Sequence, residues 1–450
     1  MLIEFTVQNF RSFKDRTTFT MIKSQGDELL STNTFHPEVP KTPSLLRTSV
    51  IYGANSSGKS NIIKALRYLK FLVINSTNFK PNRKIPIDPF IFDDESAQAP
   101  IEINISFVAG ASSKVETSSA NMNSNGEKLV RYDYGVVLNK DHVLEEWLHS
   151  YPKGRVQEWF YRKYNEEFEN NYEYTFSSLF KGNKNDWENN TRPNVLFLSN
   201  AVNLNSDQLK PIYDWFDDKL HITTETKSHF GEGYTQSICD DQFYKIQILD
   251  FLKSADIGID DFSVKKQDIS IDDLTLPPDL PESLREKLIE DISGKEIIEL
   301  KSVRDVNGKT ELLDFDEESE GTKKLFSLAG PIIDTLHEGN VLVLDELHNH
   351  LHPKLVRFII ESFNNPETNK NNAQLIFTTH DTYLMKKDIF RRDQIWFVEK
   401  DADYASHIFS LNDFSVRKDR GAEYEDQYLE GLFGAIPFTN SYSSFLAGET

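Results

Sequence analysis

Hydrophobic and polar residues follow two different periods in the first 75 residues of the chain. Residues 2–7 and 17–21 have the apolar pattern of strands, and residues 49–52 form a short apolar run that is typical of a buried strand. This spacing then changes to three and four positions, at Ile62, Ile63, Leu66, Leu69 and Val73. Such a period predicts an amphipathic helix, so we expect an α/β arrangement at this end of the chain.

The middle of the chain has a different character. Residues 101–107 alternate regularly between apolar and polar side chains, and residues 132–138 suggest another strand. We therefore predict a β-rich segment over residues 76–200, interrupted by a mobile loop at 111–128, where Ser, Asn and Gly dominate. Residues 201–309 have a more helical pattern.

The last third returns to the α/β pattern. Residues 341–344 and 374–377 are short apolar runs, which are typical of parallel strands that are buried on both faces. A polar loop and a helical pattern follow each run. The sequence thus predicts one α/β core formed by residues 1–75 and 310–450, with the β-rich and the helical segments inserted into it.

Charge and composition narrow the class of protein. The chain has 450 residues and a net charge of −21, which disfavours a surface that coats nucleic acid non-specifically but is compatible with a local basic groove. Its single cysteine, Cys239, cannot form an intramolecular disulfide, so we expect a cytoplasmic protein. The first residues lack the pattern of a signal peptide, and no apolar run reaches the ~18 residues of a transmembrane helix, so no membrane association is expected.

A phosphate-binding motif lies between the strand at 49–52 and the helix that follows it. The motif matches G-x-x-x-x-G-K-[ST] and reads Gly53-Ala54-Asn55-Ser56-Ser57-Gly58-Lys59-Ser60. The glycines let backbone N–H groups surround a phosphate chain, and the helix N-terminus adds positive charge at the same place. We expect Lys59 to reach the β- and γ-phosphates of ATP and the Ser60 hydroxyl to hold Mg²⁺.

Two carboxylates follow the apolar run at 341–344. In ATPases with a phosphate loop, an acid at the end of a buried strand helps to hold Mg²⁺, and this role suits Asp345. The next residue, Glu346, points to the other side of an extended chain and is placed to activate the attacking water. The run at 374–377 ends in Thr-Thr-His-Asp, so His380 is expected beside the γ-phosphate.

Another anion site is predicted at the start of a later helix. Ser319, Gly321 and Thr322 precede apolar residues at helical spacing, and a Ser-x-Gly turn at a helix N-terminus binds anions. Ser319 is equally suited to an ordinary helix cap. The pattern leaves both interpretations open.

Two other groups of residues have competing interpretations. His348, His350 and His352 have a spacing that suggests a zinc site, but a loop beside the γ-phosphate needs no metal other than Mg²⁺. Basic residues gather at 64–84 and at 386–392. These stretches are either solvated surfaces or contacts for DNA, RNA or an acidic partner.

The motifs in this order resemble those of ABC-type ATPases, most closely the stand-alone SMC-like and OLD-like ATPases. The resemblance covers the two ends of the chain, residues 1–75 and 310–450. The opening segment around Phe10 is similar to the start of SMC-like heads, which lies near the nucleotide. By this resemblance, Asn9 and Arg11 are implied as nucleotide contacts.

The resemblance also implies how the protein assembles. Ser319, Gly321 and Thr322 would match the ABC signature and close over the ATP of a second copy, which implies a homodimer with ATP and Mg²⁺ between its subunits. Two positions depart from the pattern: Glu320 stands where transporters have glycine, and His352 stands near where many ABC proteins have aspartate.

A narrower resemblance suggests the biological role. Residues 391–400 and 428–438 are similar to segments of the RloA-like family, whose members occur in prokaryotic abortive-infection and anti-phage loci. We therefore predict an ATP-hydrolysing dimer switch that senses infection and controls a separate effector protein, such as a nuclease encoded nearby. One alternative is a DNA-repair or DNA-maintenance ATPase that binds nucleic acid directly through a basic patch. Another is a scaffold that binds ATP with little or no hydrolysis.

Overall fold

The computed structural model describes residues 1–112, 115, 126, 128–168, 171–224, 227–228, 233–268, 296–414 and 423–437. The chain divides into two compact units. The first consists of Met1–His229, Thr335–Asn349 and Val356–Thr450, and the second of Phe230–Asp334 and His350–Leu355. Most of the predicted mobile loop at 111–128 lies outside the described residues.

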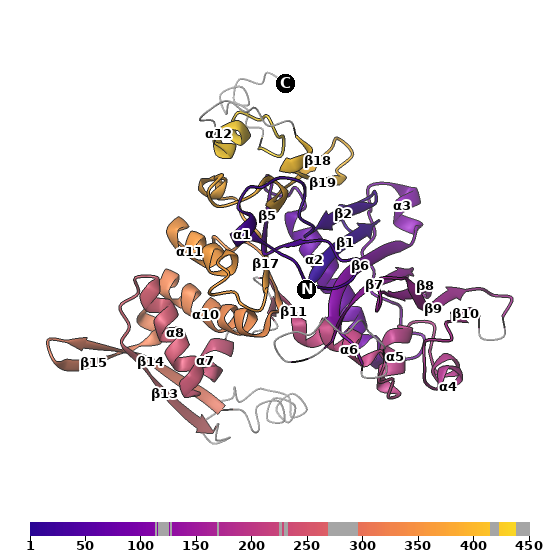
Figure 1. The fold of residues 1–450 in the computed structure, drawn as a ribbon, viewed down its shortest axis with the longest axis horizontal. Coiled ribbons are helices and arrows are strands. Elements are labelled where there is room, and N and C mark those ends of the chain that lie inside the picture. The colour runs from indigo at the N-terminus through magenta and orange to yellow at the C-terminus, as the bar shows by residue number, and fades with distance from the viewer. Residues whose placement is uncertain are drawn as a thin grey trace, which may run out of the picture. The chain divides into compact units, whose positions relative to one another are not determined.

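Two seven-stranded sheets organise the first unit (Figure 1). The strands of the antiparallel sheet are, in spatial order, β10 (Tyr172–Phe176), β9 (Gln157–Tyr164), β8 (Val143–Ser150), β7 (Leu129–Leu138), β6 (Ile101–Gly110), β1 (Leu2–Gln8) and β2 (Thr17–Thr20). Burial alternates along most of β6, as the sequence pattern predicts, so one face of this sheet is packed and the other is partly solvated.

The second sheet is mainly parallel and carries the predicted motifs. Its strands are, in spatial order, β12 (Lys227–Ser228), β11 (Leu220–Thr224), β16 (Val341–Leu344), β17 (Gln374–Thr378), β5 (Thr48–Tyr52), β18 (Ile395–Lys400) and β19 (Ser406–Ser410). The two edge strands, β12 and β19, are antiparallel to their neighbours. Every residue of β16, β17 and β5 is buried, which confirms the interpretation of their apolar runs.

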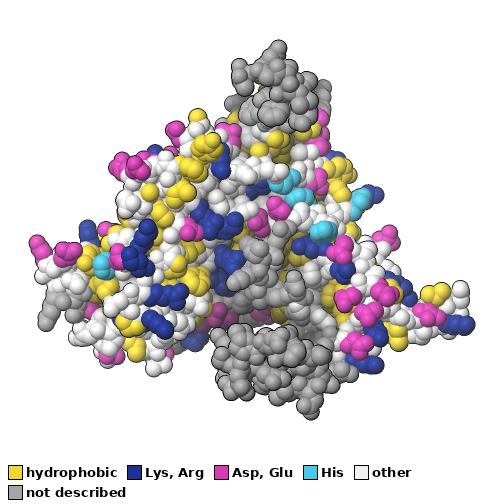
Figure 2. Space-filling view, turned by 180° about the vertical axis from the view of Figure 1, so that it is seen from behind, with side chains coloured by type: hydrophobic (Ala, Val, Ile, Leu, Met, Phe, Trp, Pro, Cys, Tyr) yellow, Lys and Arg dark blue, Asp and Glu magenta, His cyan; other side chains and the backbone are white. Residues whose placement is uncertain are grey.

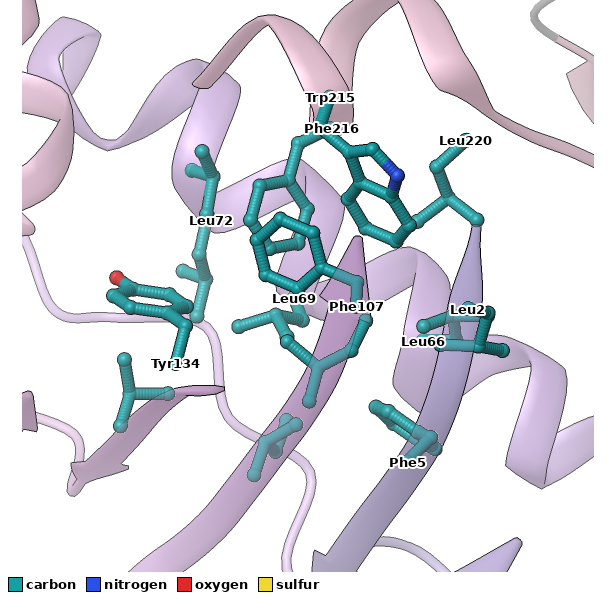
Figure 3. Packing of buried hydrophobic residues seen from close by; sticks show 14 of the residues in the cluster. Leu2, Phe5, Leu66, Leu69, Leu72, Phe107, Tyr134, Trp215, Phe216 and Leu220 are labelled. Carbon is teal, nitrogen blue, oxygen red and sulfur yellow. The ribbon is translucent and has the colours of Figure 1, made fainter. Parts of the chain in front are cut away.

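Helix α2 (Lys59–Asn75) joins the two sheets in one hydrophobic core. Its buried residues recur at helical spacing, so one stripe of the helix faces inward. Figure 3 shows Leu69, Trp215 and Phe216 gathered around the ring of Phe107. Trp215 stacks on Phe107 with ring centroids 4.2 Å apart. This packing fixes α2, and with it the phosphate loop that precedes the helix.

Short elements complete the first unit. They are α1 (Leu30–Asn33), the paired strands β3 (Thr34–Phe35) and β4 (Leu45–Leu46), α3 (Asp94–Gln98), α4 (Lys184–Asn189), α5 (Phe197–Asn203), α6 (Lys210–Asp214), α11 (Pro353–Asn364) and α12 (Tyr424–Leu429). Among the helices of the described residues, none is long and apolar enough to cross a membrane.

The structure differs from the predicted boundaries of the insertion. Strand β6, from the segment 76–200, pairs with β1 over Leu2–Gln8, so the β-rich segment and the N-terminus build one continuous sheet. Strand β11, from the segment 201–309, pairs in parallel with β16. Residue pairing across such long sequence separations leaves no local signal, which explains why the hydrophobic pattern placed these strands outside the core.

The second unit contains a three-stranded antiparallel sheet with short helices. Its elements are β13 (Asp261–Asp268), β14 (Glu296–Val306), β15 (Lys309–Asp314), α7 (Tyr234–Ile238), α8 (Gln242–Ser254) and the first part of α10 (Glu320–Glu338). Helix α10 begins at the predicted signature residues. This unit is the part of the chain that is separate from the two large sheets.

Candidate functional site

Three neighbouring parallel strands end at the same edge of the second sheet. Strand β17 lies between β16 and β5, so the residues after these strands are brought together. The phosphate loop follows β5, Asp345 and Glu346 follow β16, and His380 lies two residues beyond β17. The carboxyl edge of the sheet therefore collects the three predicted motifs.

The backbone of the phosphate loop has the conformation that its glycines were expected to allow. Gly53, Ser56 and Gly58 have positive φ angles of 154°, 61° and 114°. Helix α2 starts directly after the loop, at Lys59, and its first N–H groups have no partner within the helix. The loop and the helix start thus form a cradle of backbone donors for an anion.

Two serines that are distant in the sequence hold this cradle in place, Ser12 from the turn between β1 and β2 and Ser406 from β19. Ser406, the first residue of β19, donates its Oγ hydrogen bond to Ser57 O over 2.6 Å and its backbone N–H to Ser12 O over 2.6 Å. Ser12 Oγ in turn accepts a hydrogen bond from Asn61 Nδ2 over 2.8 Å. A side chain at Gly58 would collide with this brace, since an added Cβ would lie 2.3 Å from Ser406 Oγ.

Lys59 is buried at the centre of the loop. Its Nζ donates to the carbonyl oxygens of Gly53 and Ala54, over 2.9 and 3.0 Å. Burial lowers the pKa of Lys59 to about 8, while the nearby carboxylates of Glu346 and Asp345 oppose the shift. An incoming phosphate would raise this pKa again, because an opposite charge favours the protonated form.

Ser60 and Asp345, the two residues predicted to hold Mg²⁺, lie in direct contact. Ser60 Oγ donates to Asp345 Oδ1 over 3.1 Å, and Thr378 Oγ1 donates to the same oxygen over 2.6 Å. Hydroxyl and carboxylate oxygens are the ligands that Mg²⁺ prefers, and this ion commonly takes its remaining ligands from phosphates and water. The two side chains are therefore placed to hold Mg²⁺ next to the phosphate cradle.

Glu346 is held in an uncommon backbone conformation. Its φ angle is 53°, in the left-handed region, and its N–H donates to Thr378 Oγ1 over 2.7 Å. Asn349 Nδ2 donates to Glu346 Oε2 over 2.7 Å. These two contacts fix the backbone of Glu346 and one of its carboxylate oxygens.

His380 lies beside the same group of charges. Its ring makes an edge contact with His348, with centroids 5.6 Å apart. Burial lowers the pKa of His380 below 6.5, with further lowering from Lys59 and His348, and the carboxylates Glu346 and Asp345 act in the opposite direction. A neutral imidazole at neutral pH is suited to donating a hydrogen bond to a phosphate oxygen.

A pocket of about 300 Å³ opens over these residues. Its lining includes the predicted residues Asn55, Ser56, Ser57, Gly58, Lys59, Ser60, Glu346 and His380. It also includes Asn61, Lys64 and Lys400, which we did not predict as site residues. Ser57 Oγ is buried and has no hydrogen-bond partner among the described residues, so a donor remains available inside the loop. The residues present suit a nucleotide triphosphate with its metal ion.

Asn9 and Arg11 are not among the residues that line this pocket. Asn9 is buried, and its amide nitrogen donates to the carbonyl oxygens of Ser96 and Ala99 over 2.8 and 3.0 Å. Arg11 forms an ion pair of 2.6 Å with Asp88. In the structure, both side chains hold the loop that precedes β6, and their contact with nucleotide stays a prediction.

The signature residues lie in the second unit, at the start of α10. Ser319 Oγ accepts the N–H of Thr322 over 3.1 Å, so Ser319 caps the helix, as one of the two interpretations expected. Glu318 fixes the approach to this helix through an ion pair of 2.7 Å with Arg304 of β14. A cap of this kind still presents the helix N-terminus to solvent.

Each of the two basic stretches has a residue that is engaged within the fold. Lys70 donates to the carbonyl oxygens of Asp217 and Leu220, and Arg391 is buried against Asp393. Figure 2 shows basic and acidic side chains on the same face of the molecule, with hydrophobic side chains among them. Among the described residues, no group of three or more His, Cys, Asp and Glu side chains is arranged as a metal site, the three histidines at 348–352 included.

The C-terminal segment packs on the second sheet. Tyr428 stacks on Phe397 of β18 with centroids 5.3 Å apart, and Phe433 stacks on the same ring at 5.8 Å. Tyr428 also donates its hydroxyl hydrogen bond to Ala435 O over 2.9 Å. The segments that carried the narrower resemblance therefore contribute to the stability of the sheet that bears the site.

The sequence matches a known protein family over most of its length. Residues 49–386 match a protein family described as "AAA domain, putative AbiEii toxin, Type IV TA system". The chain belongs to this family. The matched range of this AAA-domain family includes the phosphate loop, Asp345, Glu346 and His380. No curated protein matches the sequence.

Solved structures of SMC heads are similar to this AAA-domain protein. The SMC head domain from Thermotoga maritima has a TM-score of 0.39 and 13% identity, and the similarity covers 91% of this chain and 98% of that chain. An SMC head bound to the C-winged helix domain of ScpA has a TM-score of 0.38, 14% identity, and coverage of 91% and 97%. A head from Pyrococcus furiosus, bound to the C-terminal domain of ScpA, has a TM-score of 0.36, 13% identity, and coverage of 91% and 96%.

The predicted fold class is confirmed. The family and the sheet order together show a P-loop ABC-type ATPase head. In this sheet β17 lies between β5, which precedes the phosphate loop, and β16, which precedes Asp345. Seven residues of the site were not predicted as such: Ser12, Asn61, Lys64, Asn349, Thr378, Lys400 and Ser406. Thr378 had a detectable signal, because it is the first residue after the apolar run at 374–377, as Asp345 is after the run at 341–344.

Proposed function

We propose that this protein binds ATP with Mg²⁺ and hydrolyses it. The observation that carries this proposal is the hydrogen-bonded group of Ser60, Asp345 and Thr378 beside the phosphate cradle. Mg²⁺ bound with ATP supplies positive charge to the phosphate oxygens. Ser60 and Asp345 would hold that ion, and Lys59 would bind the β- and γ-phosphates.

The chain's own side chains provide the remaining parts of the reaction. Glu346 Oε1 would accept a proton from the attacking water, because Asn349 holds the other carboxylate oxygen. His380, kept neutral by burial, would donate a hydrogen bond to the γ-phosphate as negative charge develops on it. Of these groups, Lys59, Ser60, Glu346 and His380 line the pocket.

We further propose that ATP brings two copies together. The capped N-terminus of α10, with Ser319, Gly321 and Thr322, would contact the γ-phosphate of the nucleotide bound by the second copy. Glycine suits this position, because an added Cβ at residue 321 would come within 3.1 Å of His350 O. Hydrolysis would then release the dimer, and the change of state would control a separate effector. The family description, which names an abortive-infection toxin and a toxin–antitoxin system, supports a role in anti-phage defence.

One set of measurements tests the proposal. Purified full-length protein is assayed for phosphate release and for molar mass in solution, with and without ATP and Mg²⁺. We expect turnover from the wild type, none from Lys59→Ala, and an ATP-dependent dimer that accumulates in Glu346→Gln. Ser319→Arg should remain monomeric with ATP while it still binds the nucleotide. Absence of ATP binding by the wild type would overturn the proposal, and a monomer at every nucleotide state would overturn the dimer switch alone.

A further inference from the structure

The position of the phosphate loop in the sheet sets the direction of a bound nucleotide. The groups that would surround the γ-phosphate, Glu346 and His380, follow β16 and β17 on one side of β5. On the other side of β5 lie β18 and β19. Lys400, the last residue of β18, lines the pocket on that side. A triphosphate that runs along the loop therefore places its nucleoside end toward the β18–β19 hairpin.

The tip of this hairpin carries an exposed aromatic ring. Tyr404 lies in the turn between the two strands, and its side chain is 59% exposed. The turn itself is well fixed, because Asp401 Oδ1 accepts the N–H groups of Asp403 and Ala405, each over 2.9 Å. Two residues after the ring, Ser406 binds the phosphate loop directly through Ser57 O. The ring is thus anchored a short distance from the loop.

A second exposed ring supports the first. Phe92, from the loop before β6, is 62% exposed, and its ring centroid lies 5.2 Å from that of Tyr404 with an angle of 31°. The buried ring of Phe90 packs against Phe92 from behind, with centroids 5.7 Å apart. Three aromatic side chains from two remote segments therefore meet at the β18–β19 turn, while Phe92 and Tyr404 each keep more than half of their surface exposed.

This arrangement is suited to a planar ligand. Exposed aromatic area is unfavourable in water, and covering it stabilises a complex by about 25 cal/mol per Å². Stacking of an aromatic side chain on a nucleic-acid base is tolerant of base identity and contributes about 1–3 kcal/mol per base. The location of the pair, at the nucleoside end of the phosphate loop, favours the base of the bound nucleotide over a separate partner.

We propose that Tyr404, supported by Phe92, is the stacking platform for the base of the nucleotide whose phosphates occupy the loop. The proposal rests on the proposed ATP binding and adds a residue that contacts the nucleoside. Asp401 is a positioning residue in this scheme, since it shapes the turn and does not reach the ligand itself.

Binding measurements separate the base from the phosphates. Calorimetric titration of the full chain, with Mg²⁺ present, compares ATP with inorganic tripolyphosphate, which lacks the base. We expect Tyr404→Ala to weaken ATP binding by about 5- to 100-fold while tripolyphosphate affinity stays unchanged. Tyr404→Trp should retain ATP affinity. Phe168→Ala, which removes an exposed ring from the β9–β10 turn, is the matched control and should leave both affinities unchanged.

A spectroscopic signal tests stacking directly. The fluorescence of 2-aminopurine riboside triphosphate should be quenched on binding to the wild type and restored in Tyr404→Ala. If Tyr404→Ala and Phe92→Ala leave ATP affinity and quenching unchanged, the base lies elsewhere and the aromatic pair is a surface for another protein. If the wild type binds tripolyphosphate as tightly as ATP, the platform is overturned while phosphate binding stands. Failure to bind either ligand would overturn the proposed function itself.

Discussion

Thr378 Oγ1 lies 2.6 Å from Asp345 Oδ1 and connects the acidic strand to its neighbour. The same oxygen accepts the N–H of Glu346 over 2.7 Å. One hydroxyl therefore orients the carboxylate that would hold Mg²⁺ and the backbone of the residue that would activate water. This geometry makes Thr378 a sensitive probe of the site.

Replacing Thr378 by valine should impair metal-dependent nucleotide binding without unfolding the protein. Valine keeps the shape of the side chain but removes the hydroxyl, so Asp345 loses one orienting partner. Groups that orient metal ligands typically contribute about 10- to 100-fold in metal affinity or activity. We expect the apparent Mg²⁺ affinity to fall by that factor when phosphate release is measured at increasing Mg²⁺ concentrations. Thr378→Ser should restore most of the affinity, and equal Mg²⁺ dependence in the valine variant would contradict the assigned role.

Glu346→Gln and Asn349→Ala should affect turnover to different degrees. General-base catalysis contributes about 10²–10⁴-fold to a rate, so the glutamine variant should lose that much phosphate release while its ATP affinity is retained. Asn349→Ala leaves the carboxylate in place but removes its hydrogen bond, so we expect a smaller loss. Single-turnover kinetics with bound ATP measures both effects. A glutamine variant that turns over at the wild-type rate would support the scaffold alternative.

The affinity for ATP should depend on pH through Lys59. Burial gives this side chain a pKa of about 8 in the free protein, and bound phosphate raises the pKa because it favours the charged form. Affinity should therefore be level below pH 8. Above it, affinity should fall by up to about tenfold per pH unit, until the pKa of the complex is reached. Titration with a non-hydrolysable ATP analogue between pH 6.5 and 9.5 measures the curve.

The matched control for this pH dependence is Lys400→Met, because Lys400 lines the same pocket but is separate from the loop carbonyls that hold Lys59. The bend in the curve should stay near pH 8 in this variant. If the bend disappears in Lys400→Met, or if the wild type binds equally well at pH 7 and pH 9.5, the assignment to Lys59 is wrong.

Gly58→Ala should be more damaging than Gly308→Ala. Both glycines have positive φ angles, of 114° and 77°, in a region that costs other residues about 1–2 kcal/mol. Open space surrounds Gly308, whereas a Cβ at Gly58 would lie 2.3 Å from Ser406 Oγ and 2.8 Å from Ser12 Oγ. We expect a further loss of about 1–3 kcal/mol from overpacking at Gly58.

Urea denaturation and ATP titration distinguish the two glycine variants. Gly308→Ala should lower the free energy of unfolding modestly and leave ATP binding intact, while Gly58→Ala should lose nucleotide binding as well. Equal effects of the two substitutions on ATP binding would show that the Ser406 brace does not shape the phosphate loop.

Much of the site could be predicted from the sequence because its motifs are local. The phosphate loop needs adjacent residues only, and the apolar runs that end at Asp345 and at the Thr-Thr-His-Asp segment show where parallel strands finish. The supporting residues could not be found in this way. Ser12 and Ser406 meet at the loop although 394 positions separate them in the sequence. Phe92 and Tyr404 are likewise distant in the sequence and come together only through tertiary packing.

The pairing of β6 with the N-terminal strand could not be predicted for a related reason. A strand that pairs with a remote partner has the same alternation as one that pairs with its neighbour, so β6 carried no mark of its contact with β1. Similarly, the capping interpretation of Ser319 and its signature interpretation require the same residue at the same position. The structure shows the cap, and the contact with a second copy depends on an assembly that one chain does not contain.

The contact between Ser406 and the phosphate loop has a consequence for folding during translation. Ser406 contacts the loop from near the end of the chain, and the side chain of Gln374 bonds both the N–H and the carbonyl of Leu2. A nascent chain that has left the ribosome only as far as β17 therefore has a complete phosphate motif without its support. We therefore expect nucleotide binding to begin late in translation, after β19 has been made.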